Sequence, residues 1–572
     1  MSRISLKIIG QSGAGLLSVG EIVTQALVEM GFDVVADREY PSLIKGGHSC
    51  FVIDFSKEDI FALCGNVDVM VAIDKPSMEA YYKDLKDGGI FIHGYERQFG
   101  IKKILEDMEA RGCKTVYVPT RETAISVGGN ILMQNIVLVG MLWKVLGFDY
   151  KFVQEQVEKK FASKPKLLEL DLRCLKAGFD AVSEMLEIET PEKGEKKILI
   201  DGNHAIALGA VHCGVRAFYA YPMSPSSSIL SHLANMASKT KMLVKQAEDE
   251  MTAVQMAIGS MYMGTRAFTA TSGGGFDLMT ESLSLAGIIE NPLVIVVAQR
   301  PGPGTGLPTW TLQGDLNIAM YSGHGEFPRV VIGVSEPTDC FELIQHAFNL
   351  AEVYQTPVIL LTEKVICESK YTVERFKQNS IKIERGLVEG DDLLNLKGED
   401  RYSVSSNGVS QRWMPGSSEA YYFANGDEHW ERGELTEDAE KAKAMQEKRM
   451  KKVGLIKDAL PEPIVYGEKD ADISFIGWGS SKNVMNDVVL EAAKQGVKVN
   501  YLHYSYVMPL KEEAAIKFFK ENKKVCLIEN NFTGQFGNFI EAETGLKFAD
   551  RLLKYDGRPF FVNDVLNFIH GK

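Results

Sequence analysis

Short apolar runs alternate with longer stretches of helical periodicity along most of the chain. In residues 1–190 we expect buried strands at residues 5–10, 50–54, 67–72, 89–93 and 115–118. Between these runs, apolar positions recur with the spacing of one helix face, as in the helix expected to end near Met30. Strands that alternate with helices in this way are typical of an α/β fold with a mainly parallel sheet.

The same alternation recurs twice more. Residues 191–370 contain expected strands at 198–200, 217–220, 242–245, 267–270, 293–298 and 358–362, and expected helices at 252–263 and 337–353. Residues 466–572 contain expected strands at 473–477, 497–502 and 524–528, and expected helices at 483–494 and 563–570. We therefore predict three doubly wound domains built on mainly parallel sheets.

Two polar segments interrupt this pattern. Residues 187–197 are hydrophilic and are expected to link the first two domains. Residues 371–465 are rich in polar and turn residues and end in a charged helix, expected at 436–452 with Thr436 as its N-cap. A loop this long in a compact chain is unusual. We expect a structured connector or interface arm, and a solvated linker is the alternative.

Composition excludes several classes of protein. The chain has 572 residues and a net charge of −13, which argues against a nucleic-acid partner because such proteins carry a basic stripe. No apolar run is long enough to span a membrane, and no signal-peptide pattern begins the chain, so the expected compartment is the cytoplasm. The eight cysteines are scattered singly, without the spacing of a zinc or iron–sulfur site, so we expect no metal ligands in this chain.

A glycine loop joins the first expected strand to its helix and contains Gly10, Gly13 and Gly15. Backbone N–H groups at such a loop and helix start form an anion site. The loop lacks the Gly-Lys-Ser/Thr of a phosphate-binding P-loop, and the next glycine, Gly20, does not fit the dinucleotide spacing. Asp37 nonetheless stands where a ribose-binding acid can lie. A dinucleotide, another phosphate-bearing ligand and a plain tight turn all stay open.

In the central domain, polar or glycine-rich segments follow four expected strands. Tyr221–Pro225 places the Ser224 hydroxyl at a strand end, although this serine can equally start the next helix. The acids that end at Glu250 suit a helix start, or they place a carboxylate against a basic ring nitrogen. Ser272 and Gly273 belong to a run that permits close backbone approach to a ligand. Arg300 can clamp a carboxylate or merely order its loop.

Together these segments resemble the α subunit of 2-oxoacid:ferredoxin oxidoreductases. The matching pieces are AYPMSPSSS, QAEDEMTAVQMAIG, TATSGGGFDLMTE, QRPGPGTGLPT, GDEHWERGELTED, ISFIGWGSS and ENNFTGQ. The N-terminal GQSGAGLLSVGE, with the later Gly46-Gly47-His48, is similar to the γ domain of the same family fused ahead of the α part. The resemblance covers essentially the whole chain, with the motifs in the family's order.

The resemblance implies a domain division. Residues 1–190 correspond to the γ-like domain, and residues 191–370 to the domain that binds the pyrimidine half of thiamine diphosphate. Residues 371–465 form the connector or interface arm, and residues 466–572 a transketolase-like α/β domain.

The resemblance also implies roles for single residues. Tyr221–Pro225 corresponds to the family's Tyr-Pro-Ile-Thr-Pro motif, so Ser224 contacts the oxoacid, with Met223 in place of isoleucine. Glu250 matches the glutamate that hydrogen-bonds N1′ of the thiamine aminopyrimidine, and thereby favours the imino form that removes the C2 proton. Arg300 matches the arginine that binds the substrate carboxylate. Further expected contacts are Tyr221 and Thr305 for substrate, and Ser272 and Gly273 for cofactor.

The same resemblance implies partners. The chain shows no Gly-Asp-Gly…Asn-Asn stretch for Mg²⁺ and diphosphate, and no cysteine cluster. A separate β subunit is therefore expected to carry thiamine diphosphate with Mg²⁺ and a [4Fe–4S] cluster, with ferredoxin as electron acceptor. Coenzyme A takes the acyl group, and Gly10, Gly13 and Gly15 are candidate contacts for its phosphates. A dimer of αβ pairs is the expected assembly.

Substrate choice is the least determined feature. A fused γ–α chain is most similar to the 2-oxoglutarate enzymes, which make succinyl-CoA, while pyruvate and branched-chain or aromatic 2-oxoacids stay open. Direction of reaction and oxygen tolerance stay open as well. The rival hypotheses are an NAD(P)-dependent oxidoreductase that uses residues 1–190, and a non-catalytic assembly subunit on the same fold.

Overall fold

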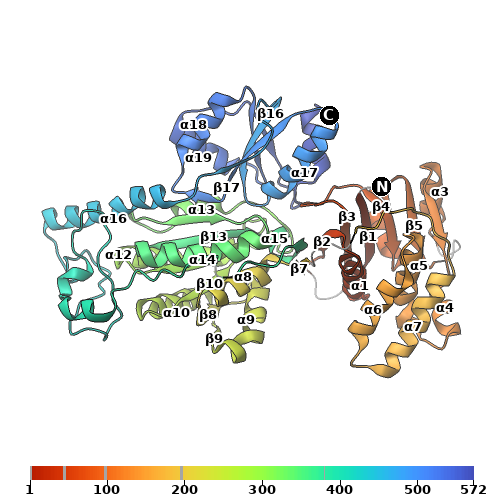
Figure 1. Cartoon of the computed structure of the whole chain (residues 1–572), viewed down its shortest axis with the longest axis horizontal. Coiled ribbons are helices and arrows are strands. Elements are labelled where there is room, and N and C mark those ends of the chain that lie inside the picture. Colours follow the sequence, from red (N-terminus) through yellow and green to blue (C-terminus); the bar gives the residue numbers. More distant parts are fainter. Residues whose placement is uncertain (1–2, 43–46, 96–99, 193–196, 379, 572) are drawn as a thin grey trace. The chain divides into compact units, whose positions relative to one another are not determined.

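The computed structural model describes residues 3–42, 47–95, 100–192, 197–378 and 380–571 (Figure 1). The chain forms two compact units. The first contains Met1–Ile200, Ser369–Arg375 and Phe561–Lys572, and the second contains Asp201–Glu368 and Phe376–Phe560. The four domain ranges expected from the sequence stay a prediction, and the units are described below one at a time.

The first unit is built on an eight-stranded sheet in the order β6-β5-β4-β1-β3-β2-β14-β7. Its parallel half consists of β1 (Arg3–Gln11), β4 (Val67–Ala72), β5 (Leu85–His93) and β6 (Lys114–Tyr117). Its antiparallel half consists of β3 (His48–Ser56), β2 (Asp33–Glu39), β14 (Lys370–Val373) and β7 (Ile198–Ile200). The parallel half follows the predicted alternation. The antiparallel half arises because β2 and β3 follow each other without a helix, and β14 returns from far along the sequence.

Helices cover both faces of this sheet. They are α1 (Leu16–Glu29), α2 (Lys75–Tyr81), α3 (Lys102–Ala110), α4 (Thr120–Ser126), α5 (Gln134–Val145), α6 (Tyr150–Phe161), α7 (Pro165–Asp180) and α20 (Val562–Ile569). One core cluster contains α1 and α5, and another contains α3. At the α5–α7 contact, a Cβ on Gly178 would collide with the Val137 carbonyl, so a glycine is needed for the helices to pack this closely.

The second unit contains a seven-stranded sheet in the order β18-β12-β13-β11-β10-β8-β9. Six strands run parallel: β8 (Ala217–Ala220), β9 (Leu243–Gln246), β10 (Ala267–Thr271), β11 (Leu293–Gln299), β12 (Val330–Gly333) and β13 (Pro357–Glu363). The antiparallel edge strand is β18 (Tyr506–Met508). Sequence periodicity predicted five of the parallel strands to within one residue and did not predict β12.

Helices lie between these strands (Figure 1). They are α8 (Gly202–His212), α9 (Ser227–Thr240), α10 (Glu250–Tyr262), α11 (Gly273–Asp277), α12 (Thr280–Ile288), α13 (Leu316–Tyr321), α14 (Pro337–Tyr354) and α15 (Lys364–Glu368). Strand and helix alternate as the apolar pattern predicted, and the doubly wound α/β architecture is confirmed.

A five-stranded sheet completes the second unit, in the order β15-β17-β16-β19-β20. Its strands are β15 (Ile464–Gly467), β16 (Ile473–Trp478), β17 (Val499–Tyr504), β19 (Val525–Glu529) and β20 (Asp550–Leu553), with helices α17 (Ser481–Lys494), α18 (Glu512–Glu521) and α19 (Gln535–Thr544). Gln313 joins the two sheets, because its Nε2 donates to the Trp478 carbonyl at 2.9 Å and its own carbonyl accepts from Asn531 at 2.8 Å.

Residues 380–460 cross the second unit as an arm with little regular structure before a long helix. The arm contains the 3₁₀ turns η4 (Gly390–Asn395) and η5 (Gly398–Arg401) and the helix α16 (Ala439–Ala459). The expected N-cap, Thr436, is wrong. Asp438 caps α16 instead and accepts from the Lys441 amide at 3.0 Å, because the helix begins after it.

Two buried clusters of charge hold this arm in place. Glu290 pairs with Lys448 at 2.5 Å and with Lys452, and all three side chains are inaccessible to solvent. Burial alone would raise the pKa of Glu290, but Lys448, Lys452 and Arg401 hold it well below its ordinary value. A second acid, on α14, pairs with three arginines: Glu352 with Arg266, Arg385 and Arg412. The arm is therefore packed against the unit and is not a solvated linker.

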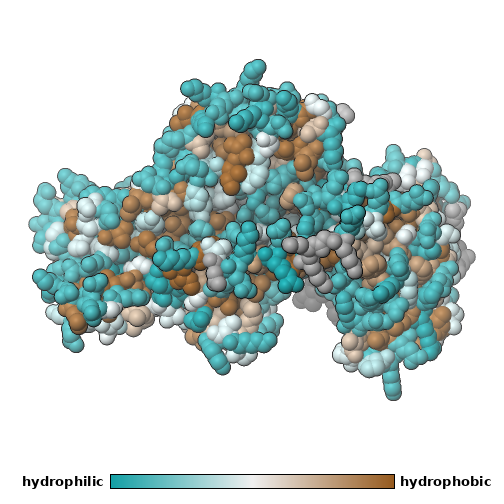
Figure 2. Space-filling model, viewed as in Figure 1, coloured by the Kyte–Doolittle hydropathy of each residue, from teal (hydrophilic) through white to brown (hydrophobic). Residues whose placement is uncertain are grey.

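In the part of the chain that the structure describes, no helix combines the length and apolar character that crossing a membrane requires. On the face drawn in Figure 2, hydrophilic residues surround smaller hydrophobic patches.

Lys448→Met should destabilise the second unit, because it leaves Glu290 buried with one of its two lysine partners missing. We expect a loss of about 3–5 kcal/mol in the free energy of unfolding, measured by chemical denaturation of the full chain. Lys443→Met, at an exposed position of the same helix, is the matched control. Equal stability of the two variants would contradict a role for the buried pair.

Candidate functional site

The candidate site lies at the carboxyl edge of four neighbouring parallel strands. In the order β11-β10-β8-β9, each strand pairs in parallel with the next. Tyr221–Pro225 follows β8, Glu250 follows β9, Ser272 follows β10 and Arg300 follows β11. Ligands of open α/β sheets bind outside the carboxyl ends of the strands. The fold therefore brings together segments that the sequence analysis singled out separately.

Ser224 and Arg300 meet at this edge. The Arg300 Nη1 donates to the Ser224 backbone carbonyl at 2.8 Å, although β10 lies between their strands. A second contact holds the loop that contains Ser224: Asn203 Nδ2 donates to the Pro225 carbonyl at 2.8 Å. Both side chains of the pair are half-buried. A guanidinium braced in this way presents its other N–H groups in a fixed plane, as bidentate binding of a carboxylate requires.

Glu250 is a buried acid at the start of α10. Capping of this helix is done by Asp249, whose side chain accepts from the Thr252 amide at 2.7 Å. Glu250 is only 4% exposed, and its Oε1 has no hydrogen-bond partner within the described chain. A buried carboxylate oxygen without a donor is costly. The position therefore fits a ligand that brings a donor, such as a protonated ring nitrogen.

Glycines at the start of α11 make room for two acids. A Cβ at Gly275 would lie 2.5 Å from Glu250 Oε1, and a Cβ at Gly273 would lie 2.5 Å from Asp315 Oδ2. The Ser272 hydroxyl beside them is buried and has no hydrogen-bond partner among the described residues. Three buried oxygens therefore gather around one short backbone segment, which is an arrangement that fits a polar cofactor.

Asp315 is a site residue that the sequence analysis missed. Its backbone amide donates to Gln299 Oε1 at 3.0 Å, and its Oδ2 is buried without a hydrogen-bond partner in the described chain. Burial and the negative charge of Asp277 raise the pKa of Asp315 to about 7, against the effect of Arg300. The carboxyl can therefore hold or release a proton near neutral pH. Only its place in the loop that follows Arg300 could have signalled it.

Tyr221 and Thr305, the other expected substrate contacts, lie further out. Tyr221 is 40% exposed, and Thr305 is exposed on the loop after Arg300. Among the described residues, Thr305 pairs with neither Ser224 nor Arg300. Their roles stay predictions.

The glycine loop belongs to the first unit, where it joins β1 to α1. Gly13 and Gly15 have φ angles of 91° and 84°, and no atom lies within 4 Å of a Cβ built on Gly13. Gly15 is the N-cap of α1, so no side chain at this position accepts from the first N–H groups of the helix. Gly10 instead packs against Ile73. Asp37 is buried and accepts from the Ser369 hydroxyl at 2.7 Å, so it is not placed as a ribose-binding acid.

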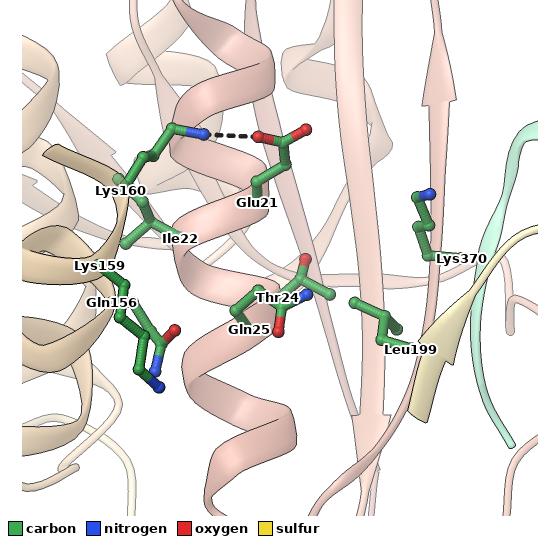
Figure 3. Close-up of a pocket in the computed structure, with 9 residues that line it drawn as sticks. All are labelled: Glu21, Ile22, Thr24, Gln25, Gln156, Lys159, Lys160, Leu199 and Lys370. Atoms are coloured by element: carbon green, nitrogen blue, oxygen red, sulfur yellow. Dashed lines mark hydrogen bonds and ion pairs between the residues drawn. The ribbon is translucent and has the colours of Figure 1, made fainter. Parts of the chain in front are cut away.

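The first unit also contains a cavity of about 380 Å³ between α1, α6, β7 and β14 (Figure 3). Two of its lysines are paired, Lys160 with Glu21 at 2.5 Å and Lys159 with Glu29 at 3.3 Å. Figure 3 shows Lys160 directed at Glu21. Because acids balance these cations, the lining does not indicate a strongly anionic ligand.

Comparison with known proteins decides the family. Residues 5–181 match the family model described as pyruvate ferredoxin/flavodoxin oxidoreductase. Residues 208–448 match the model described as pyruvate flavodoxin/ferredoxin oxidoreductase, thiamine diphosphate-binding. The α subunit of a 2-oxoacid:ferredoxin oxidoreductase from a Sulfolobus species is 31% identical in an alignment that covers 98% of this chain and 96% of that protein. The chain belongs to the 2-oxoacid:ferredoxin oxidoreductase family.

Other relatives agree. The 2-oxoglutarate oxidoreductase subunit KorA of Mycobacterium tuberculosis is 27% identical, over all of this chain and 91% of that protein. Among solved structures, the 2-oxoglutarate:ferredoxin oxidoreductase of Magnetococcus marinus matches with a TM-score of 0.93 and 29% identity, over 100% of this chain and 99% of that one. That structure has 2-oxoglutarate, coenzyme A and succinyl-CoA bound. The predicted family, α/β fold and oxidoreductase class are confirmed.

Asp315→Asn should remove a pH-dependent cost of folding. The pKa of the Asp315 carboxyl is raised in the folded chain, so protonation of this carboxyl favours the folded state. That contribution to stability is complete below the ordinary pKa range of a carboxyl and is lost as pH rises through about 7. Asparagine mimics the protonated form. The variant's advantage in free energy of unfolding over the wild type should therefore grow by about 1–3 kcal/mol between pH 5 and pH 8.

Denaturant unfolding of the full chain between pH 5 and 8 measures this difference. Asp392→Asn, at an exposed position of the arm, serves as the control. A variant whose stability follows the wild-type pH curve would rule out the raised pKa.

Proposed function

We propose that this chain is the α subunit of an enzyme that oxidatively decarboxylates a 2-oxoacid with coenzyme A, and that 2-oxoglutarate is its preferred substrate. The products would be succinyl-CoA and CO₂, with electrons passed to ferredoxin. The main support is the match over the whole chain to the Magnetococcus marinus enzyme, which has 2-oxoglutarate, coenzyme A and succinyl-CoA bound. Pyruvate and other 2-oxoacids are the alternatives that the experiment below distinguishes.

Thiamine diphosphate, when bound, supplies the nucleophilic carbon for decarboxylation. Glu250 would hold a proton at the pyrimidine N1′ through Oε1, the buried oxygen that no residue of the described chain satisfies. Because the site is buried, a charge-assisted hydrogen bond there is stronger than in water. Gly273 and Gly275 leave the carboxyl oxygens of Asp315 and Glu250 space that a side chain would fill.

Arg300 would bind the substrate carboxylate. Burial lowers the pKa of Arg300, yet an arginine keeps its charge at neutral pH. The Ser224 carbonyl fixes one nitrogen of the guanidinium, so the side chain loses little further freedom when substrate binds. The Ser224 hydroxyl lies on the same loop and would orient the oxoacid, and Tyr221 and Thr305 would line its outer part.

A β subunit would complete the site. Relatives of this chain are named as α subunits, and the eight cysteines here are free and dispersed. We therefore assign Mg²⁺ and the [4Fe–4S] cluster to the partner. Apolar side chains exposed in the segments after the strands support a covered surface there: Met251 at 50%, Leu278 at 49% and Leu307 at 42%. A cytoplasmic dimer of αβ pairs is the proposed assembly.

The test uses the complex coexpressed with its β subunit. CoA-dependent viologen reduction is measured with 2-oxoglutarate, pyruvate, 2-oxoisovalerate and phenylpyruvate, and 2-oxoglutarate should give the highest kcat/KM. Glu250→Gln should lower kcat by ~10²–10⁴-fold, because the amide cannot favour the imino form of the cofactor. Glu248→Gln, an exposed acid at the same helix start, should change little.

The outcomes separate the parts of the proposal. Preference for another 2-oxoacid would overturn the substrate while keeping the reaction. Full activity of Glu250→Gln would remove its role at N1′. An intact complex that reduces no viologen with any of the four acids would refute the proposed reaction.

The glycine loop would contact the phosphates of coenzyme A through the backbone N–H groups at the start of α1. Gly13→Val should raise the KM for coenzyme A several-fold with little change in kcat, because a side chain there would enter the open space before the helix. Gly88→Val is a matched control in the same unit, since Gly88 also has positive φ (74°) and open space around its Cβ. Equal KM values for the two variants would refute the contact.

A further inference from the structure

Two histidines and an aspartate meet where α8 begins. Asp201 is the N-cap of α8, His204 lies in its first turn and His232 lies on α9. One ligand atom from each lies within 4.8 Å of the other two. The two helices pack against each other within the second unit. The sequence analysis expected no metal ligands in this chain, because the cysteines lack motif spacing. His232 lies on a different helix from Asp201 and His204, so no local pattern joins the three residues.

Asp201 and His204 have the spacing of two ligands on one tetrahedral ion. Two ligands at about 2.0–2.2 Å from a tetrahedral zinc ion lie about 3.3–3.6 Å from each other. Asp201 Oδ2 is 3.6 Å from His204 Nδ1. The two imidazole rings are 3.1 Å apart between centroids and inclined by 25°. This separation is shorter than the ~4.5–7 Å of ordinary aromatic pairs.

We propose that Asp201, His204 and His232 bind one divalent transition-metal ion of the zinc type, with water in the fourth position. Imidazole ligands favour such ions over Mg²⁺ and Ca²⁺, which prefer oxygen. Asp201 is 6% exposed and is oriented by its own helix, because Oδ1 accepts from the His204 amide at 2.7 Å while Oδ2 faces the His204 ring. One ligand is thus held in place before the ion arrives.

Such an ion would brace the loop that contains Ser224. Asn203, between the two α8 ligands, donates to the Pro225 carbonyl at 2.8 Å and to the Ser228 hydroxyl at 2.7 Å. Ser228 and His232 lie one turn apart on α9. The ion would therefore hold α9 against α8 beside the contact that fixes the loop.

The test is calorimetric titration of Zn²⁺ into the untagged, chelator-treated full chain. We expect one saturable site per chain that Mg²⁺ does not fill. His204→Ala and His232→Ala should each weaken Zn²⁺ binding at least tenfold. His324→Ala, which removes an exposed imidazole from the same unit, should leave it unchanged.

Asp201→Asn separates loss of the metal ligand from misfolding, because asparagine is as good an N-cap as aspartate but a poorer metal ligand. It should fold normally and bind Zn²⁺ more weakly. X-ray absorption at the zinc edge should show nitrogen and oxygen ligands only. Absence of a saturable site, equal affinity in the Asp201, His204 and His232 variants, or sulfur ligation would each overturn the proposal.

Discussion

Parallel pairing of β8, β9, β10 and β11 is the constraint on which the candidate site depends. Neighbouring parallel strands point the same way, so their carboxyl ends share one edge of the sheet. Buried apolar residues lie side by side in this register, such as Ala217 and Ala267. This pairing carries Ser224 and Arg300 to within hydrogen-bonding distance although many residues separate them in the chain. Without the common edge, the same residues would be unrelated turns.

Crowding at that edge gives the site its chemical character. Glycines after β10 let the backbone approach Glu250 and Asp315 more closely than any side chain would permit. Buried oxygens on Glu250, Ser272 and Asp315 are left without donors in the described chain. Such oxygens lower stability unless a ligand satisfies them. The unit is therefore less stable without a polar cofactor at this site than with one, and packing elsewhere in the unit must compensate.

The arm is held in place by buried charges that are distant from it in sequence. Glu290 with Lys448 and Lys452, and Glu352 with its three arginines, are buried charge clusters that leave little freedom of position. Each of these charges would lower the stability of the unit if it were buried without a partner. The arm therefore packs where its charged side chains pair with those of the rest of the unit. The structured arm explains how so polar a segment can lie within a compact unit.

The sequence by itself determined the α/β class, half of the described strands to within one residue at each end, and the segments that carry Ser224, Glu250, Ser272 and Arg300. These features are local: apolar runs, helical periodicity and turn residues act over a few neighbouring positions. Tertiary structure alone decided the antiparallel half of the first sheet, the place of Asp315, the buried partners of Glu290 and the meeting of His204 with His232. Each of these depends on contacts between segments far apart in the chain, and local sequence patterns do not specify which distant segments will contact each other.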